Sequence, residues 1–253
     1  MSIEQELEKE GIYIVKQLDT LTTNSIAKSV AVKLVKAFPN QKLSYDDLFI
    51  RLSRINMYIA KMPAGANAKY YYKTQSIYFS EKVNFAAIDT YAIHECIHAL
   101  QEYRDKSGAL IRLGFCNFLS RKLPGMALNE AAVQLMSAYT KKARLDTVKY
   151  FDIALPTYSP SHYALECTLV SQMAYFTGLY DLFNSTLYSN DIFMEKFVLL
   201  TSRSCFFIVQ NNMDELMALE DELAVQNQLL AEVDFGLLIH LLKPSIHPYC
   251  FVQ

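Results

Sequence analysis

Residues 85–105 read FAAIDTYAIHECIHALQEYRD, a run that contains neither Gly nor Pro. The run predicts one helix of roughly five to six turns. Asn84 or Asp89 would cap its start, and Gly108 lies just beyond its end. Apolar residues recur in it at helical spacing, so we expect this helix to pack against a core.

Residues 94–98, HECIH, place two imidazoles and a carboxylate within this helix. Residues four apart lie on one helical face, about 6 Å apart along the axis. Histidine rings at that spacing can converge on one zinc ion at roughly 2.0–2.1 Å. Glu95 is rotated away from His94, which suits a general base that takes a proton from water beside the metal. The alternative is a chance match on an ordinary amphipathic helix.

A catalytic zinc site usually has three protein ligands and one open position. The third ligand here is a nearby His, a nearby Asp, a distant Glu or none. The extended motif H-E-x-x-H-x-x-G-x-x-H does not apply, because residues 101–105 supply neither its glycine nor its third histidine. Residues 126–139 predict a helix in which Glu130 lies among apolar residues. We expect Glu130 to be the third ligand. An exposed glutamate on a polar face is the alternative, and Glu166 is a competing acid.

HExxH followed by NEAA at residues 129–132 resembles the gluzincin metallopeptidases, the zincins with a glutamate as third ligand. The resemblance covers about residues 57–140. It implies Glu95 as general base and Zn²⁺ bound by His94, His98 and Glu130. Gluzincins often carry Asp one turn after the ligand glutamate. Here that residue is Gln134, whose amide oxygen can accept the same hydrogen bond from a ligand histidine without a charge.

The segment before the helix predicts a small sheet, as in zincins. Strand character recurs over residues 57–62, 69–73 and 76–80. In zincins the edge strand of such a sheet can hold an extended peptide by backbone hydrogen bonds. We expect Ser76–Ser80 to have this binding role, with a purely structural hairpin as the alternative.

Composition predicts a folded, cytoplasmic protein. The chain has 253 residues, of which 52% are hydrophobic, enough for a sizeable core. A net charge of −2 gives no general attraction to nucleic acid or to an anionic membrane. No apolar run reaches the roughly 18 residues that span a bilayer, and the acidic N-terminus lacks an apolar signal region.

Cysteine usage agrees with that compartment. The five cysteines form no C-x-x-C pair: Cys96, Cys116, Cys167, Cys205 and Cys250. Most lie in apolar helical stretches, where free cysteine behaves as a small hydrophobic residue. We interpret Cys96 as a packing residue, because its position in the helix directs it away from the histidines. A catalytic Cys–His pair is the alternative.

The rest of the chain is predicted to be mostly helical. The expected helices cover residues 3–18, 23–38, 45–55, 161–187, 193–209 and 213–230. A loop with two prolines at 155–160 is the expected boundary between two domains. The first, residues 1–154, would hold the N-terminal helices, the sheet and the metal-site helices. The second, residues 155–253, would be a C-terminal helical subdomain, although one continuous domain is also compatible.

These patterns predict an α+β, predominantly α-helical, zincin-like protein that hydrolyses peptide bonds with Zn²⁺. Its partner would be a peptide or protein substrate, without nucleic acid or membrane, and the sequence gives no oligomeric state. Two alternatives stay open: a metal-dependent hydrolase of a non-peptide amide, and a helical interaction protein with a structural or vestigial zinc site. Candidates for a group that stabilises the transition state are Tyr158, His162, Tyr163 and His240.

Overall fold

The computed structural model describes residues 3–63, 65–119, 124–150 and 152–229. The chain divides into two compact units, Met1–Asp214 and Glu215–Gln253. Helices predominate in the described part and the strands form small sheets, so the fold is α+β and mainly helical, as predicted. The domain boundary predicted between residues 154 and 155 lies inside the first unit and stays a prediction.

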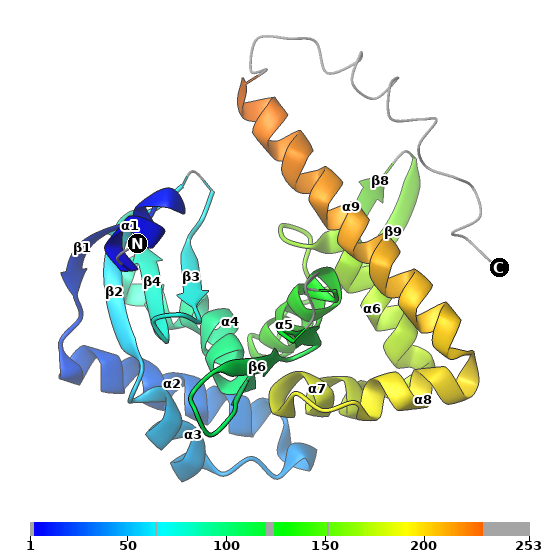
Figure 1. Cartoon of the computed structure of the whole chain (residues 1–253), viewed down its shortest axis with the longest axis horizontal. Helices are drawn as coiled ribbons and strands as arrows, with labels where there is room; N and C mark the ends of the chain where they lie inside the picture. The colour runs from blue at the N-terminus through cyan, green and yellow to red at the C-terminus, as the bar shows by residue number, and fades with distance from the viewer. Residues whose placement is uncertain (1–2, 64, 120–123, 151, 230–253) are drawn as a thin grey trace. The chain divides into compact units, whose positions relative to one another are not determined.

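A four-stranded sheet precedes the helix that carries the histidines (Figure 1). Its strand order is β1-β2-β4-β3, with the bounds β1 Tyr13–Gln17, β2 Asn56–Lys61, β3 Ala68–Tyr71 and β4 Ser76–Ser80. β4 pairs in parallel with β2 and antiparallel with β3, and it is buried throughout. The prediction of Ser76–Ser80 as an edge strand is therefore wrong. β3 forms the edge instead, beside helix α4 (Ile88–Gln101).

β1 takes the place of the second half of the helix predicted over residues 3–18. Helix α1 covers only Ile3–Lys9, and Gly11 follows it with a φ of 71° that glycine adopts without strain. Tyr13–Gln17 then pairs with β2. Its aromatic and β-branched residues favour an extended backbone, so pairing across the sheet overrides the amphipathic pattern.

Polar side chains begin the helices that follow. Asp19 caps the N-terminus of α2 (Thr20–Ala37), and Ser44 caps the N-terminus of α3 (Tyr45–Leu52). In each case the side-chain oxygen accepts a hydrogen bond from the backbone N–H three residues on, which satisfies a donor that lacks a partner inside the helix. Between them lies a 3₁₀ turn, Pro39–Gln41.

Helix α4 ends at Gln101, before the predicted end at residue 105. The chain continues into a three-stranded antiparallel sheet made of β5 Glu102–Arg104, β6 Leu110–Leu113 and β7 Cys116–Asn117. The Glu102 carboxylate accepts hydrogen bonds from the Tyr70 hydroxyl at 2.6 Å and from the Arg104 side chain at 2.7 and 2.8 Å. These contacts tie the end of α4 to the edge strand β3.

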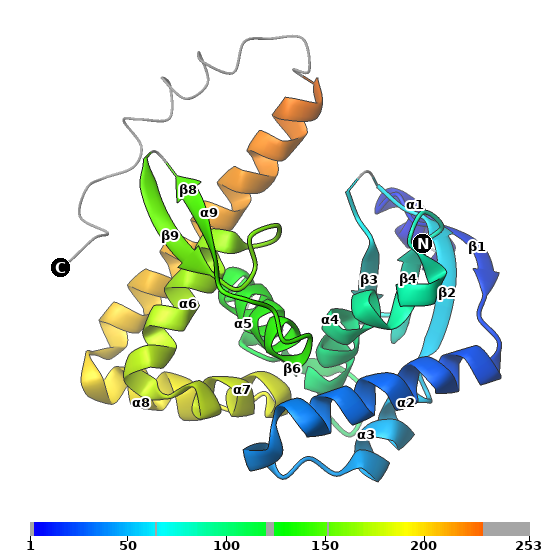
Figure 2. The ribbon, with the colours of Figure 1, turned by 180° about the vertical axis from the view of Figure 1, so that it is seen from behind.

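Helix α5 covers Met126–Thr140, as its apolar run predicts, and lies beside α4 (Figures 1 and 2). A hairpin follows, with strands β8 Asp146–Tyr150 and β9 Ile153–Thr157, so residues 155–157 belong to a strand and not to the predicted loop. The remaining helices are α6 Ala164–Thr177, α7 Leu179–Tyr188, α8 Ile192–Leu200 and α9 Arg203–Leu229. Gly178 divides the helix predicted over 161–187, whereas α9 joins regions predicted as separate helices.

No helix in the described part of the chain has both the length and the apolar character needed to cross a membrane.

Candidate metal centre

The two histidines of the HECIH segment converge from successive turns of α4. Their Nε2 atoms lie 3.0 Å apart. Glu130, which projects from α5, places its Oε2 atom 3.3 Å from the Nε2 atom of each histidine. Helices α4 and α5 pack against each other, and both bury apolar residues, among them Ile93 and Ile97 of α4 and Leu128, Ala131 and Leu135 of α5. The structure therefore brings together His94 and His98, whose spacing places them on one helical face, and Glu130 from the neighbouring helix.

The distances within this triad fit a zinc ion. Bonds of roughly 2.0–2.1 Å at tetrahedral angles separate neighbouring ligand atoms by about 3.3–3.4 Å. The three ligand atoms of the triad lie 3.0–3.3 Å from one another. Two imidazole nitrogens and one carboxylate oxygen are also a donor set typical of catalytic zinc. The His94 and Glu130 side chains keep 15% and 18% of their surface exposed, which gives the centre access to solvent.

Each histidine uses its other ring nitrogen in a hydrogen bond with a glutamine. His94 Nδ1 lies 2.9 Å from Gln134 Oε1, and His98 Nδ1 lies 3.0 Å from Gln101 Oε1. An amide oxygen only accepts, so each Nδ1 carries the hydrogen and donates it. In the neutral rings both Nε2 lone pairs then face Glu130. The sequence predicts the role of Gln134, but Gln101 was not anticipated.

The triad strongly favours a positive charge between its atoms. Burial lowers the pKa of His98, but the Glu130 carboxylate opposes this effect, and the net result raises the pKa to about 9. Burial raises the pKa of Glu130, yet His98 and His94 hold that pKa well below its usual range. At neutral pH a proton therefore resides among these atoms unless a metal cation takes its place.

Glu95 lies next to the triad and is not one of its members. Its side chain is buried, and its Oε2 atom accepts a hydrogen bond from the backbone N–H of Tyr70 at 2.6 Å. Tyr70 belongs to the edge strand β3, so this bond fixes the carboxylate between α4 and the edge of the sheet. Glu95 is close enough to the histidines that its charge helps to raise the pKa of His98.

The other predicted candidates separate into near and distant groups. Burial lowers the pKa of His162, and the charges of His94 and Lys141 lower it further, which places His162 in the vicinity of the triad. Tyr158 packs against Tyr139, with their ring centroids 5.1 Å apart. Tyr163 adopts a left-handed conformation immediately before α6. His240 lies outside the described residues.

The alternative ligands and nucleophiles do not join the centre. Glu166 is buried on α6 and is not among the residues whose ligand atoms gather with those of the histidines in the described part of the chain. Cys96 is fully buried, and burial raises the pKa of its thiol. This environment supports its interpretation as a packing residue.

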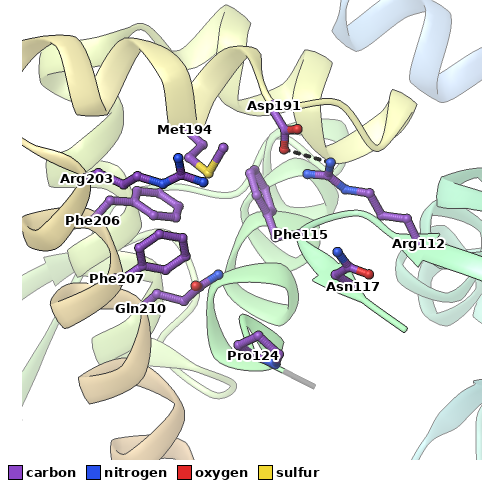
Figure 3. Close-up of a pocket in the computed structure, with 10 residues that line it drawn as sticks. All are labelled: Arg112, Phe115, Asn117, Pro124, Asp191, Met194, Arg203, Phe206, Phe207 and Gln210. Atoms are coloured by element: carbon purple, nitrogen blue, oxygen red, sulfur yellow. Dashed lines mark ion pairs between the residues drawn. The ribbon is translucent and has the colours of Figure 1, made fainter. Parts of the chain in front are cut away.

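A separate cavity of about 270 Å³ contains none of the predicted site residues (Figure 3). Its wall includes Phe115, Met194, Phe206 and Phe207, together with Arg112, which forms an ion pair with Asp191 at 2.7 Å. The sequence gives no signal for this cavity, because its lining residues come from separate parts of the chain: β6, β7 and the segment before α5, and helices α8 and α9 with the residue before α8.

Comparison of the chain with protein-family models, with curated proteins and with solved structures finds no match.

Proposed function

We propose that this protein is a zinc-dependent metallopeptidase in which His94, His98 and Glu130 bind the ion and Glu95 is the general base. The observation that carries the proposal is the convergence of three donor atoms, 3.0–3.3 Å apart, next to a buried carboxylate that belongs to the same helix. Buried polar groups without a compensating partner are costly, and a cation at the centre of the triad would compensate all three at once.

The surroundings of the triad support a zincin-like arrangement. A small sheet precedes α4, and its edge strand β3 runs beside that helix. One backbone group of β3 points toward the site, since Tyr70 N–H donates to Glu95. An extended peptide that adds to this edge would lie alongside Glu95 and would pair with edge groups other than the Tyr70 N–H, which Glu95 already accepts.

Each residue around the triad has a separate catalytic role in this proposal. The bound ion would act as a Lewis acid toward the substrate carbonyl and would make a water molecule more acidic. Glu95 accepts the proton of the attacking water and passes it to the departing amine. The Tyr70 N–H holds one oxygen of the carboxylate, and no hydrogen bond among the described residues occupies the other oxygen. Gln134 and Gln101 orient the two histidines.

Metal analysis combined with a peptide assay tests this proposal. Purified protein should contain stoichiometric zinc, and cleavage of a mixed peptide library should stop after chelation and return with added zinc. Stoichiometric zinc without cleavage would favour the non-peptide amidase or the structural zinc site. Protein that binds no zinc at all would overturn the proposal.

We predict that the zinc affinity rises with pH. In the metal-free protein the pKa of His98 is about 9, so a proton must leave this ring before the ion can bind. One displaced proton makes the affinity about tenfold weaker for each pH unit below that pKa. Competition with a chelator of known protonation constants, measured between about pH 6 and pH 8, checks the slope. An affinity that does not change over this range would contradict the prediction.

A further inference from the structure

A buried chain of hydrogen bonds leads from His98 to the main chain of a neighbouring loop. Phe115 N–H donates to Asn129 Oδ1 at 3.2 Å, and because a backbone N–H only donates, the atom that faces it must be the amide oxygen. The same oxygen accepts from Gln101 Nε2 at 3.0 Å. The other end of the Gln101 amide, its Oε1 atom, therefore faces His98 Nδ1. The backbone thus sets the orientation of both amides.

A second chain starts at His94 and ends on a backbone carbonyl. Ser159 Oγ donates its only hydrogen to the carbonyl oxygen of His162 at 2.6 Å. Ser159 Oγ must therefore accept at its contact with Gln134 Nε2, 2.8 Å away. The Gln134 amide is turned so that its Oε1 atom faces His94 Nδ1. Both chains consequently end on a backbone group whose role as donor or acceptor cannot change.

We infer that Gln101 and Gln134 are positioning residues that hold both histidines as Nδ1–H tautomers and so direct both Nε2 lone pairs at the metal position. The inference rests on the proposed metal centre, but it does not depend on what the centre hydrolyses. Neutral amides would perform here the task for which ligand histidines often use a carboxylate. They add no negative charge to that of the carboxylates of Glu130 and Glu95.

The Gln101 chain is packed so closely that it has little freedom to rearrange. Gln101 and Asn129 are each 1% exposed. A Cβ atom on Gly114 would lie 1.9 Å from Asn129 Oδ1 and 2.4 Å from Gln101 Nε2, so only glycine leaves room for the two amides to meet. Ser189 Oγ, just after the end of α7, accepts from Gly114 N–H and donates to the Gln101 carbonyl, which anchors the same region. The contact with His98 is therefore fixed from several sides.

The inference is tested with methionine variants. Met has the length of Gln but cannot accept the histidine hydrogen bond strongly. Gln101→Met and Gln134→Met should each weaken zinc binding about 10- to 100-fold, the range found when the partner of a ligand histidine is removed. Gln134→Glu keeps an acceptor for His94 Nδ1, and Ser159 Oγ can turn its hydrogen to the second carboxylate oxygen, so this variant should bind zinc at least as tightly as the parent. Gln41→Met is the matched control, because Gln41 is a buried amide bonded to Tyr180 O, away from the triad.

Ring-nitrogen NMR of the zinc-loaded protein gives a readout independent of activity. The parent should show an exchange-protected Nδ1–H on both His94 and His98, and each methionine variant should lose the protection of its own histidine only. If Gln101→Met does not fold, the parent spectrum and the partly exposed Gln134 position still decide the matter.

Three results would overturn the inference. In the first, zinc is bound through a histidine Nδ1 atom in the parent. In the second, the methionine variants bind zinc as tightly as Gln41→Met does. In the third, the parent binds no zinc. The first two leave the metal centre standing, whereas the third removes the proposed function as well. Zinc binding with the expected Nδ1–H signals but without peptide cleavage would support the inference and contradict only the peptidase.

Discussion

Glu95→Gln should lower peptide hydrolysis by the zinc-loaded protein by roughly 10²–10⁴-fold, the usual effect of losing a positioned general base. The amide keeps the shape of the side chain but takes up no proton at neutral pH. Attacking water then has no acceptor for its proton, and the departing amine has no donor. The zinc content should stay at the parent level, because Glu95 lies outside the group of ligand atoms formed by His94, His98 and Glu130.

The structure explains why the Gln variant is the sharper test. Tyr70 N–H donates to Glu95 Oε2 at 2.6 Å, and the amide oxygen of Gln can accept the same bond. Glu95→Ala would leave that buried N–H without a partner, a cost of about 1–3 kcal/mol that mixes folding with catalysis. Initial rates on a mixed peptide library, with thermal unfolding and zinc content measured on the same samples, check the prediction.

Glu10→Gln is the matched control, because the Glu10 side chain forms an exposed ion pair with Lys69 and is not one of the gathered ligands in the described part of the chain. The control should keep the parent activity. If Glu95→Gln cleaved peptides as fast as the control, Glu95 would not be the base.

The candidate site could be predicted from sequence largely because its spacing is local. His94 and His98 share a helical face, and Gln134 follows Glu130 by one turn, so helix geometry alone brings each pair together. Gln101 has the same kind of signal, since it lies three residues after His98. The orientation of its amide, however, depends on a hydrogen bond to Asn129 on a different helix. A local sequence pattern does not predict that contact.

The errors in the fold arise where long-range pairing decides. Residues 13–17 fit a helical pattern, but their pairing with β2 makes them a strand. Ser76–Ser80 was predicted as a strand, yet its neighbours on both sides, and hence its interior position, are set by the order of the sheet. Pro156 in β9 suggested a loop, although proline is compatible with a strand in a two-stranded hairpin, where it lies at an edge.

Replacing either histidine of the triad should reduce zinc binding below detection. His98→Ala removes one nitrogen ligand and also the main charge that keeps the pKa of Glu130 low, so the remaining carboxylate is buried with a weaker partner. His94→Ala similarly leaves one nitrogen and one oxygen, fewer than the three protein ligands of catalytic zinc sites. Glu130→Ala should weaken binding strongly but leave a loose site formed by two histidines, because water can replace a carboxylate oxygen.

The zinc content of each variant is measured after gel filtration. Its zinc affinity is measured by competition with a chelator. His162→Ala is the matched control, because it removes an imidazole near the triad that is not one of the gathered ligands. That variant should keep full zinc. Full occupancy in both His94→Ala and His98→Ala would exclude these residues as ligands. Unchanged affinity in Glu130→Ala would leave the two histidines in place and require another acid as the third ligand, with Glu166 the first to be replaced.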